Sequence, residues 1–238
     1  MTVYPLTLVQ ATANLRIDLN DPTGASQRWQ DTDLQRGLDR ANERLSAVEP
    51  DLESIQLATV AKQNIYAKPA NALWIDRVEY PAGQWPPSYP AFSELRYPTV
   101  LTAPLFTAGT DVFRLEIPPE QYPPDTTSYY IEVRYALKHQ LDGSGTTIPE
   151  RHWDALYDGA KVAAIDIYLS NINDNFVYAD GQLRDRVDDT KSVEAWRAFR
   201  DLLEARFAQR LKQIRDEQIQ SARFTPAWGD KPLRWERT

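Results

Sequence analysis

The chain has 238 residues, of which 42% are hydrophobic and 26% are charged, a composition typical of a globular protein that buries a sizeable core. Its lack of cysteine excludes disulfides, thiolate nucleophiles and cysteine metal sites, and fits assembly in a reducing cytoplasm. A formal net charge of −7 argues against a general nucleic-acid coat, because such a coat needs a basic surface.

Two amphipathic helices are expected near the N-terminus. The first covers residues 7–19, with apolar side chains on one face at Leu8, Ala11, Leu15 and Leu19. Turn-forming residues at 20–26 separate the two helices. The second helix begins at Thr32, where Gln35 three residues later completes a capping-box pattern, and it ends before Pro50.

A β-rich segment follows. Alternating apolar and polar residues predict strands, and the alternation is clearest at 129–137. Ten of the seventeen prolines fall within residues 81–124, where they predict loops and edges because proline cannot donate to a sheet. The expected strands are 54–60, 64–68, 73–80, 111–117 and 129–137.

Helical periodicity returns after the glycines at 143 and 145. Pro149 suits the start of a third helix, which is expected to reach about residue 170 and to be followed by a polar loop. Ser192 is the expected N-cap of a fourth helix that ends near Ala222 and has a length of roughly 45 Å. Its apolar face comprises Trp196, Phe199, Leu203, Phe207, Leu211 and Ile214.

The predicted fold class is therefore α+β. Two helices plus two helices form a four-helix bundle, because neither pair buries its apolar stripe alone, and a β-rich insertion interrupts it. The expected parts are a discontinuous helical domain at 1–53 and 141–222, a β-rich domain at 54–140, and an extended C-terminal tail at 223–238.

No residue pattern indicates an enzyme, a cofactor or a metal. His139 is expected to face solvent, and His152 beside Asp154 is expected at the surface in a first helical turn, without a nucleophile in a recognisable setting. The polar stretch 171–181 lacks the ligand register of a calcium loop, and the glycines at 143 and 145 lack the context of a phosphate loop. The N-terminus lacks the features of a signal peptide, and no stretch approaches the roughly 18 apolar residues of a membrane span, so a soluble protein is expected.

The C-terminal tail favours docking onto a partner. From Arg223 onward it has four basic and two acidic residues, no periodicity, and exposed aromatic side chains of the kind that anchor interfaces. The alternative is that the tail folds back over its own domain. The candidate docking residues are Phe224, Pro226, Trp228, Lys231, Arg234 and Trp235.

Several stretches of the helical half resemble the head–tail adaptor (connector) proteins of tailed bacteriophages. They are LRIDLND at 15–21, RWQDTDLQRGLDRANERL at 28–45, IEVRY at 131–135, HQLD at 139–142 and IPERHWDALYDGA at 148–160. The resemblance covers about half of the chain. It implies a structural virion protein that forms a ring, commonly dodecameric, between the portal protein and the tail or a tail-completion protein, with DNA passing through the channel without sequence-specific binding. It also implies that the C-terminal tail inserts into the portal.

A ring needs two different complementary faces on each subunit. The candidates for subunit contacts are charged residues on one exposed face of the second helix: Arg36, Asp39, Arg40, Glu43 and Arg44. The alternative is that these side chains form an ordinary solvated surface. Competing functions are another tail or baseplate component, or a carbohydrate-binding module in which Trp85 and Trp74 stack on sugars. Of the two tryptophans, Trp74 is expected to lie in a strand with its side chain in the core.

Overall fold

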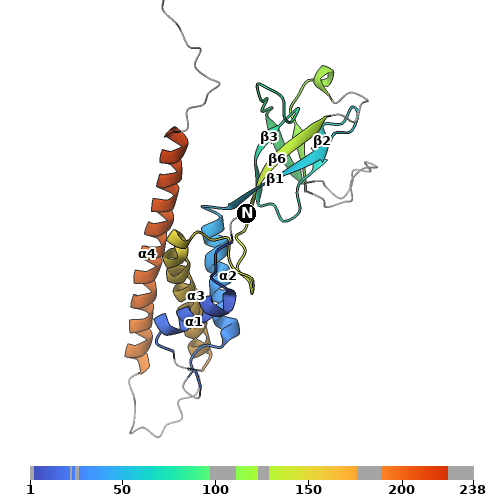
Figure 1. Ribbon diagram of the computed structural model, residues 1–238. Coiled ribbons are helices and arrows are strands. Elements are labelled where there is room, and N and C mark those ends of the chain that lie inside the picture. The colour runs from blue at the N-terminus through green and yellow to red at the C-terminus, as the bar shows by residue number, and fades with distance from the viewer. Residues whose placement is uncertain are drawn as a thin grey trace, which may run out of the picture. The chain divides into compact units, whose positions relative to one another are not determined.

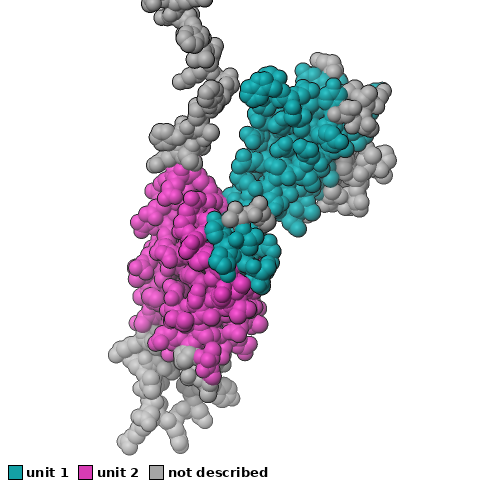
Figure 2. All heavy atoms as spheres, viewed as in Figure 1, with its two compact units in different colours: residues 1–5, 50–148 teal, residues 6–49, 149–238 magenta. Residues whose placement is uncertain are grey.

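The protein is α+β, as predicted. Its computed structural model describes residues 3–21, 23–24, 27–96, 111–122, 129–175 and 189–224, and this part of the chain contains four α-helices and two three-stranded antiparallel sheets (Figure 1). The chain divides into a β unit and a helical unit (Figure 2). The β unit comprises residues 1–5 and 50–148, and the helical unit comprises 6–49 and 149–238.

The helical unit contains α1 (Leu8–Asp18), α2 (Asp31–Ser46), α3 (Trp153–Asn175) and α4 (Asp189–Phe224). A short 3₁₀ turn, Glu150–His152, precedes α3. Helix α3 contacts the other three helices and lies between α2 and α4 (Figure 1), so most of its circumference is buried. Packing of all four helices on each other is confirmed.

The starts of the first two helices differ in detail from the sequence prediction. A capping box lies at Thr7 and Gln10 of α1. Helix α2 begins at Asp31, before the expected Thr32 cap, and Asp33 accepts a hydrogen bond from the backbone N–H of Gln30. Acidic side chains in a first turn stabilise the positive end of the helix dipole, which favours this earlier start.

The two later helices are longer than expected. Helix α3 continues to Asn175, through the first part of the segment expected to be a polar loop. Helix α4 begins at Asp189, which places Ser192 inside the helix and excludes it as the N-cap, and it ends at Phe224. At 36 residues, α4 is about 54 Å long.

The β unit buries one core between its two sheets. The first sheet has the order β1 (Asp51–Ala58), β6 (Tyr130–Leu137), β3 (Trp74–Glu79), and the second has the order β2 (Ile65–Ala67), β5 (Asp111–Leu115), β4 (Phe92–Arg96). Both sheets contribute to the cluster of Tyr66, Ile75, Val78, Tyr80, Phe113, Leu115, Ile131 and Val133.

The five predicted strands are present, and β4 is an additional one. The sequence of β4, FSELR, has little apolar alternation, and it pairs along its length with β5. Strand β1 begins at Asp51, earlier than expected, because Asp51 pairs with Leu137 at the end of β6. Trp74 is 36% exposed, so its assignment to the core was wrong; Ile75 and Val78 of the same strand face the core instead.

Candidate assembly surface of the helical unit

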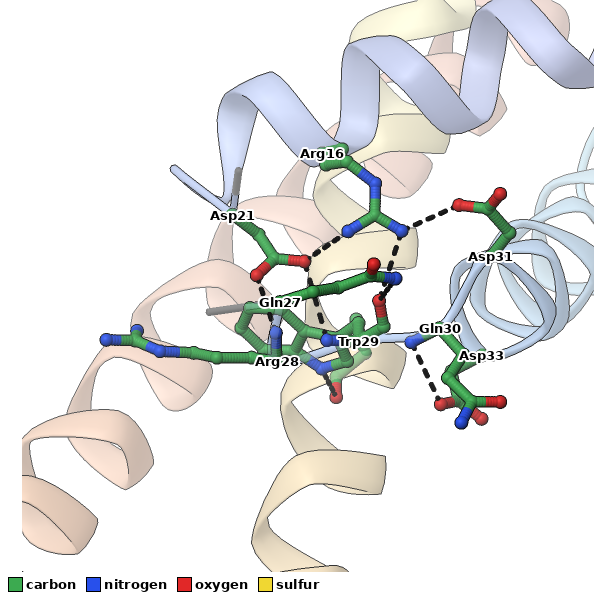
Figure 3. Close-up of polar contacts among 9 residues, drawn as sticks. Arg16, Asp21, Gln27, Arg28, Trp29, Gln30, Asp31 and Asp33 are labelled. Atoms are coloured by element: carbon green, nitrogen blue, oxygen red, sulfur yellow. Dashed lines mark hydrogen bonds and ion pairs between the residues drawn. The ribbon is translucent and has the colours of Figure 1, made fainter. Parts of the chain in front are cut away.

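A buried arginine ties α1 to the start of α2. Arg16 lies on the buried side of α1, and its guanidinium donates to Asp21 at 2.5 Å and to Asp31 at 2.6 Å. The same group donates to the backbone carbonyl of Trp29 at 3.0 Å (Figure 3). A buried charge needs such complete pairing, because an unpaired one costs several kcal/mol.

Asp21 holds the other side of this connection. Its carboxylate, which is almost fully buried, accepts from the backbone N–H of Arg28 at 2.7 Å and of Trp29 at 3.4 Å (Figure 3). The Arg16–Asp21 pair therefore fixes both ends of the connection between α1 and α2. We call Arg16, Asp21, Trp29 and Asp31 the arginine node.

Trp29 extends the node to the other two helices. Its indole N–H donates to the carbonyl oxygen of Ala164 in α3 at 2.7 Å, and its ring is fully buried. The ring lies 5.4 Å from Tyr168 of α3 and 5.9 Å from Trp196 of α4. One side chain thus joins the α1–α2 connection to both C-terminal helices.

The aromatic contacts continue to the surface. Trp196 packs edge-on against Phe199 at 6.2 Å, and the guanidinium of Arg28 lies 5.7 Å from the Trp196 ring centre. Phe199 is 42% exposed. An exposed aromatic ring supported by a partly buried one presents an apolar surface, the kind of group that anchors protein interfaces.

The node draws its residues from two stretches that the sequence analysis singled out. Residues 15–21 supply Arg16 and Asp21, and residues 28–45 supply Trp29 and Asp31. Sequence reasoning did not foresee this cluster. An available signal was the position of Arg16 beside Leu15, on the side of α1 that the apolar pattern assigns to the core.

Ion pairs link the remaining helix surfaces within the chain. Arg44 of α2 binds Glu204 of α4 through two hydrogen bonds of 2.6 and 3.0 Å and lies 4.5 Å from the Phe207 ring centre. The hydrogen bond from Arg44 lowers the pKa of Glu204 from its ordinary value. Arg44 is therefore engaged within its own subunit. The other candidates for subunit contacts all lie exposed on α2: Arg36, Asp39, Arg40 and Glu43.

Both histidines are buried, contrary to the sequence expectation. His139 contacts the hydroxyl of Thr147 at 3.0 Å, where the chain folds back after β6. His152 lies in the first helical turn as expected, but its side chain is enclosed and lies 2.5 Å from the Glu49 carboxylate. This hydrogen bond lowers the pKa of Glu49 from its ordinary value. Asp154 instead contacts Arg210 at 3.1 Å, so a His152–Asp154 dyad is absent.

The predicted docking tail lies almost wholly outside the described residues. Phe224 is the last residue of α4, so the helix extends past the expected start of the tail at residue 223. Its side chain is not among those described. Nor are the other tail candidates: Pro226, Trp228, Lys231, Arg234 and Trp235.

The β unit contains a pocket of about 430 Å³ with uncharged walls. Three tyrosines and two glutamines are among its lining residues: Tyr80, Tyr122, Tyr129, Gln84 and Gln121. Trp85, on the loop that supplies Gln84, is 91% exposed. Aromatic rings and amides together suit a neutral ligand with both apolar faces and hydroxyl groups.

Within the described ranges, no cluster of three or more His, Asp or Glu side chains is arranged to hold a metal ion. The helices in these ranges are also too short or too polar to cross a membrane.

No family model matches the chain, and no curated protein matches it. Among solved structures, it is similar to a chain described as "Neck of empty GTA particle computed with C6 symmetry". The identity is 14%, the match covers 82% of this chain and 95% of that chain, and the TM-score is 0.28.

Proposed function

We propose that this chain is a structural virion protein, a subunit of an oligomeric ring that connects the capsid portal to the tail. One observation supports this most: the stretches that resemble phage adaptors supply the arginine node, where the α1–α2 connection meets α3 and α4. The resemblance thus falls on residues that determine how the helical unit is assembled. The implied partners are the portal protein, a tail or tail-completion protein, and further copies of this chain in a dodecameric ring.

The proposed role is passive, without catalysis or cofactor. His139 and His152 are enclosed and paired within the fold. The net charge of −7 suits a channel wall that repels phosphate, so that passing DNA does not adhere. The C-terminal residues 225–238 are the proposed portal-docking segment.

Light scattering and negative-stain imaging of the chain, alone and with purified portal, test the ring. Closed rings in either sample are the expected result. A stable monomer that never binds portal at high concentration would contradict the proposal.

Truncation after Phe224 tests the tail. This variant keeps every residue of α4, so its circular dichroism spectrum should match that of the full chain, while its binding to portal should be lost. Unchanged portal binding by the folded truncated chain would refute the docking role.

The uncharged pocket and the exposed Trp85 favour a second candidate, a carbohydrate-binding module. Binding to a glycan array tests it, with Trp85→Ala as the variant and Trp74→Ala as the matched control. Glycan binding that is lost only on Trp85→Ala, in a chain that fails to bind portal, would favour this function over the ring.

A further inference from the structure

Strand β1 lies at the edge of its sheet with one side free. Its neighbour is β6, and no other strand in the described part of the chain pairs with it. Just past β1, the backbone N–H of Thr59 donates to Tyr129, which shows that odd-numbered residues bond the β6 side. The alternate residues of an antiparallel ladder point their N–H and C=O groups away from that partner. Within the described residues these groups have no hydrogen-bond partner at four positions: Leu52, Ser54, Gln56 and Ala58.

This edge suits the addition of another strand. Strand β1 has eight residues in continuous register with β6, whereas a register shift interrupts the ladder of β3 on the other edge. Its sequence contains neither proline nor lysine, which commonly protect a free edge. An extended segment that adds to such an edge gains affinity from main-chain hydrogen bonds and specificity from alternate side chains.

The face of β1 that meets the core has an acidic half and an apolar half. Asp51 and Glu53 come first, and neither carboxylate contacts a cation within the described residues. Glu53 accepts a hydrogen bond from the Tyr135 hydroxyl, and one carboxylate oxygen of Asp51 is buried without a partner. Ile55 and Leu57 follow on the same face, and Ile55 is 39% exposed although Leu57 packs against the core. A matching strand therefore offers a basic side chain to the first half and apolar side chains to the second.

We propose that residues 233–238 of one copy add to the β1 edge of the next copy as an antiparallel strand, a contact that rests on the proposed ring. The segment reads LRWERT, so two apolar residues and an arginine alternate along it. The resulting neighbours are Leu233 with Leu57, Trp235 with Ile55 and Arg237 with Glu53. Each apolar side chain meets an apolar partner, and the guanidinium meets a carboxylate that lacks a cation.

The order of residues favours this arrangement over its alternatives. Pro232 falls opposite Ala58 at the end of β1, and proline is tolerated at the first residue of a strand. A parallel strand runs the other way and would place Arg237 at the apolar end of β1. A second β1 strand offers no cation, because its sequence, DLESIQLA, contains no basic residue. Pairing of two different segments from neighbouring copies also repeats around a closed ring.

The contact divides the C-terminal tail between two partners. Eight residues, 225–232, connect the end of α4 to the added strand and remain available to the portal. Fully extended, they span at most about 28 Å.

The chain has no cysteine, so engineered cysteines report this contact without background. Glu53→Cys and Arg237→Cys are made as separate full-length variants, mixed with portal under conditions where rings form, and oxidised. Facing residues of a non-hydrogen-bonded pair have Cα atoms about 4.5 Å apart, so the mixture should give at least about tenfold more disulfide-linked dimer than either variant alone. The matched control replaces Glu53→Cys by Ser54→Cys, an exposed position on the opposite face of β1, and should give no increase.

An exchange of charges is the second measurement. Glu53→Arg should lower the fraction of chains in rings at least about fivefold, because two like charges meet at every subunit contact. Adding Arg237→Glu to the same chain should restore the rings. Circular dichroism should match the parent for both variants. Rings at the parent level from a folded Glu53→Arg chain contradict the proposed neighbours.

The outcomes separate this contact from the ring itself. Rings that form without the mixed cross-link overturn the edge contact and leave the ring proposal standing. Equal cross-linking by Glu53→Cys alone overturns the edge contact as well, because it shows two β1 strands side by side. An equal yield from the Ser54→Cys control overturns the register. Neither rings nor cross-links, with portal present, overturns both proposals.

Discussion

Removing Arg16 should destabilise the helical unit by about 3 kcal/mol. Arg16→Ala leaves the carboxylate of Asp21 almost fully buried without its cation, and breaking a buried ion pair costs roughly 3–5 kcal/mol. The lower end applies because Asp21 keeps its hydrogen bonds from the backbone of Arg28 and Trp29. The second carboxylate partner, Asp31, is largely exposed and regains water, so it adds little.

The double variant Arg16→Met/Asp21→Asn separates charge burial from packing. It removes both charges and keeps side chains of similar size, so the loss should fall to about 1 kcal/mol. Urea unfolding followed by far-ultraviolet circular dichroism measures the helical transition. Arg36→Ala, an exposed change on α2, serves as the control and should stay within about 0.5 kcal/mol of the parent. A loss below about 1 kcal/mol for Arg16→Ala, or a double variant as unstable as the single one, would refute the reasoning.

Three further changes test other contacts. Gly159→Ala should destabilise by about 1–3 kcal/mol, although alanine usually favours a helix, because the added Cβ would lie 2.8 Å from the Phe207 ring. The pair with His152 lowers the pKa of Glu49 in the folded chain, so the ionised carboxylate stabilises the fold above its unfolded pKa near 4.5. This stability is lost as the pH falls through the pKa of the folded chain. Glu49→Gln should therefore make the free energy of unfolding depend less on pH in the acidic range. Arg44→Ala should cost only about 0.5–1 kcal/mol, since its ion pair is partly exposed, and less at high salt.

Each of these has a clear contrary result. Thermal unfolding that shows Gly159→Ala to be as stable as the parent would mean that the Phe207 ring moves aside at little cost. Urea midpoints measured at several pH values would contradict the Glu49 prediction if parent and variant lose stability in parallel below about pH 4.5. For Arg44→Ala, a loss above about 2 kcal/mol that salt does not change would show that the contact with the Phe207 ring dominates.

The sequence predicts the regular elements well where apolar periodicity is strong. Ile131 and Val133 alternate with polar neighbours in β6, and both are fully buried. Strand β4 was missed because a short edge strand with Ser93 and Glu94 carries almost no such pattern, and its pairing with β5 comes from a segment distant in sequence. Apolar periodicity predicts which face of a helix or strand a residue occupies. It does not predict which segments of the chain contact each other.

The site was harder to foresee for the same reason. The arginine node depends on contacts between residues 5 to 15 positions apart, through a connection whose shape the sequence does not state. The environment of His152 depends on Glu49, which is distant in the sequence and adjacent in the fold. A polar side chain at a position that the apolar pattern assigns to the core, as with Arg16, is the most useful warning of such a cluster.

The pairing of β1 with β6 has a consequence for how this protein can change over time. Asp51 and Leu137 face each other at the end of the ladder, so the strand that opens the insertion and the strand that ends it run side by side. Strand partners lie only about 5 Å apart, so the segment from Asp51 to Leu137 is an insertion whose two ends adjoin. A segment with adjoining ends can be exchanged, enlarged or lost between α2 and α3 without moving the two points at which it joins the helical framework. The two halves are free to diverge at different rates.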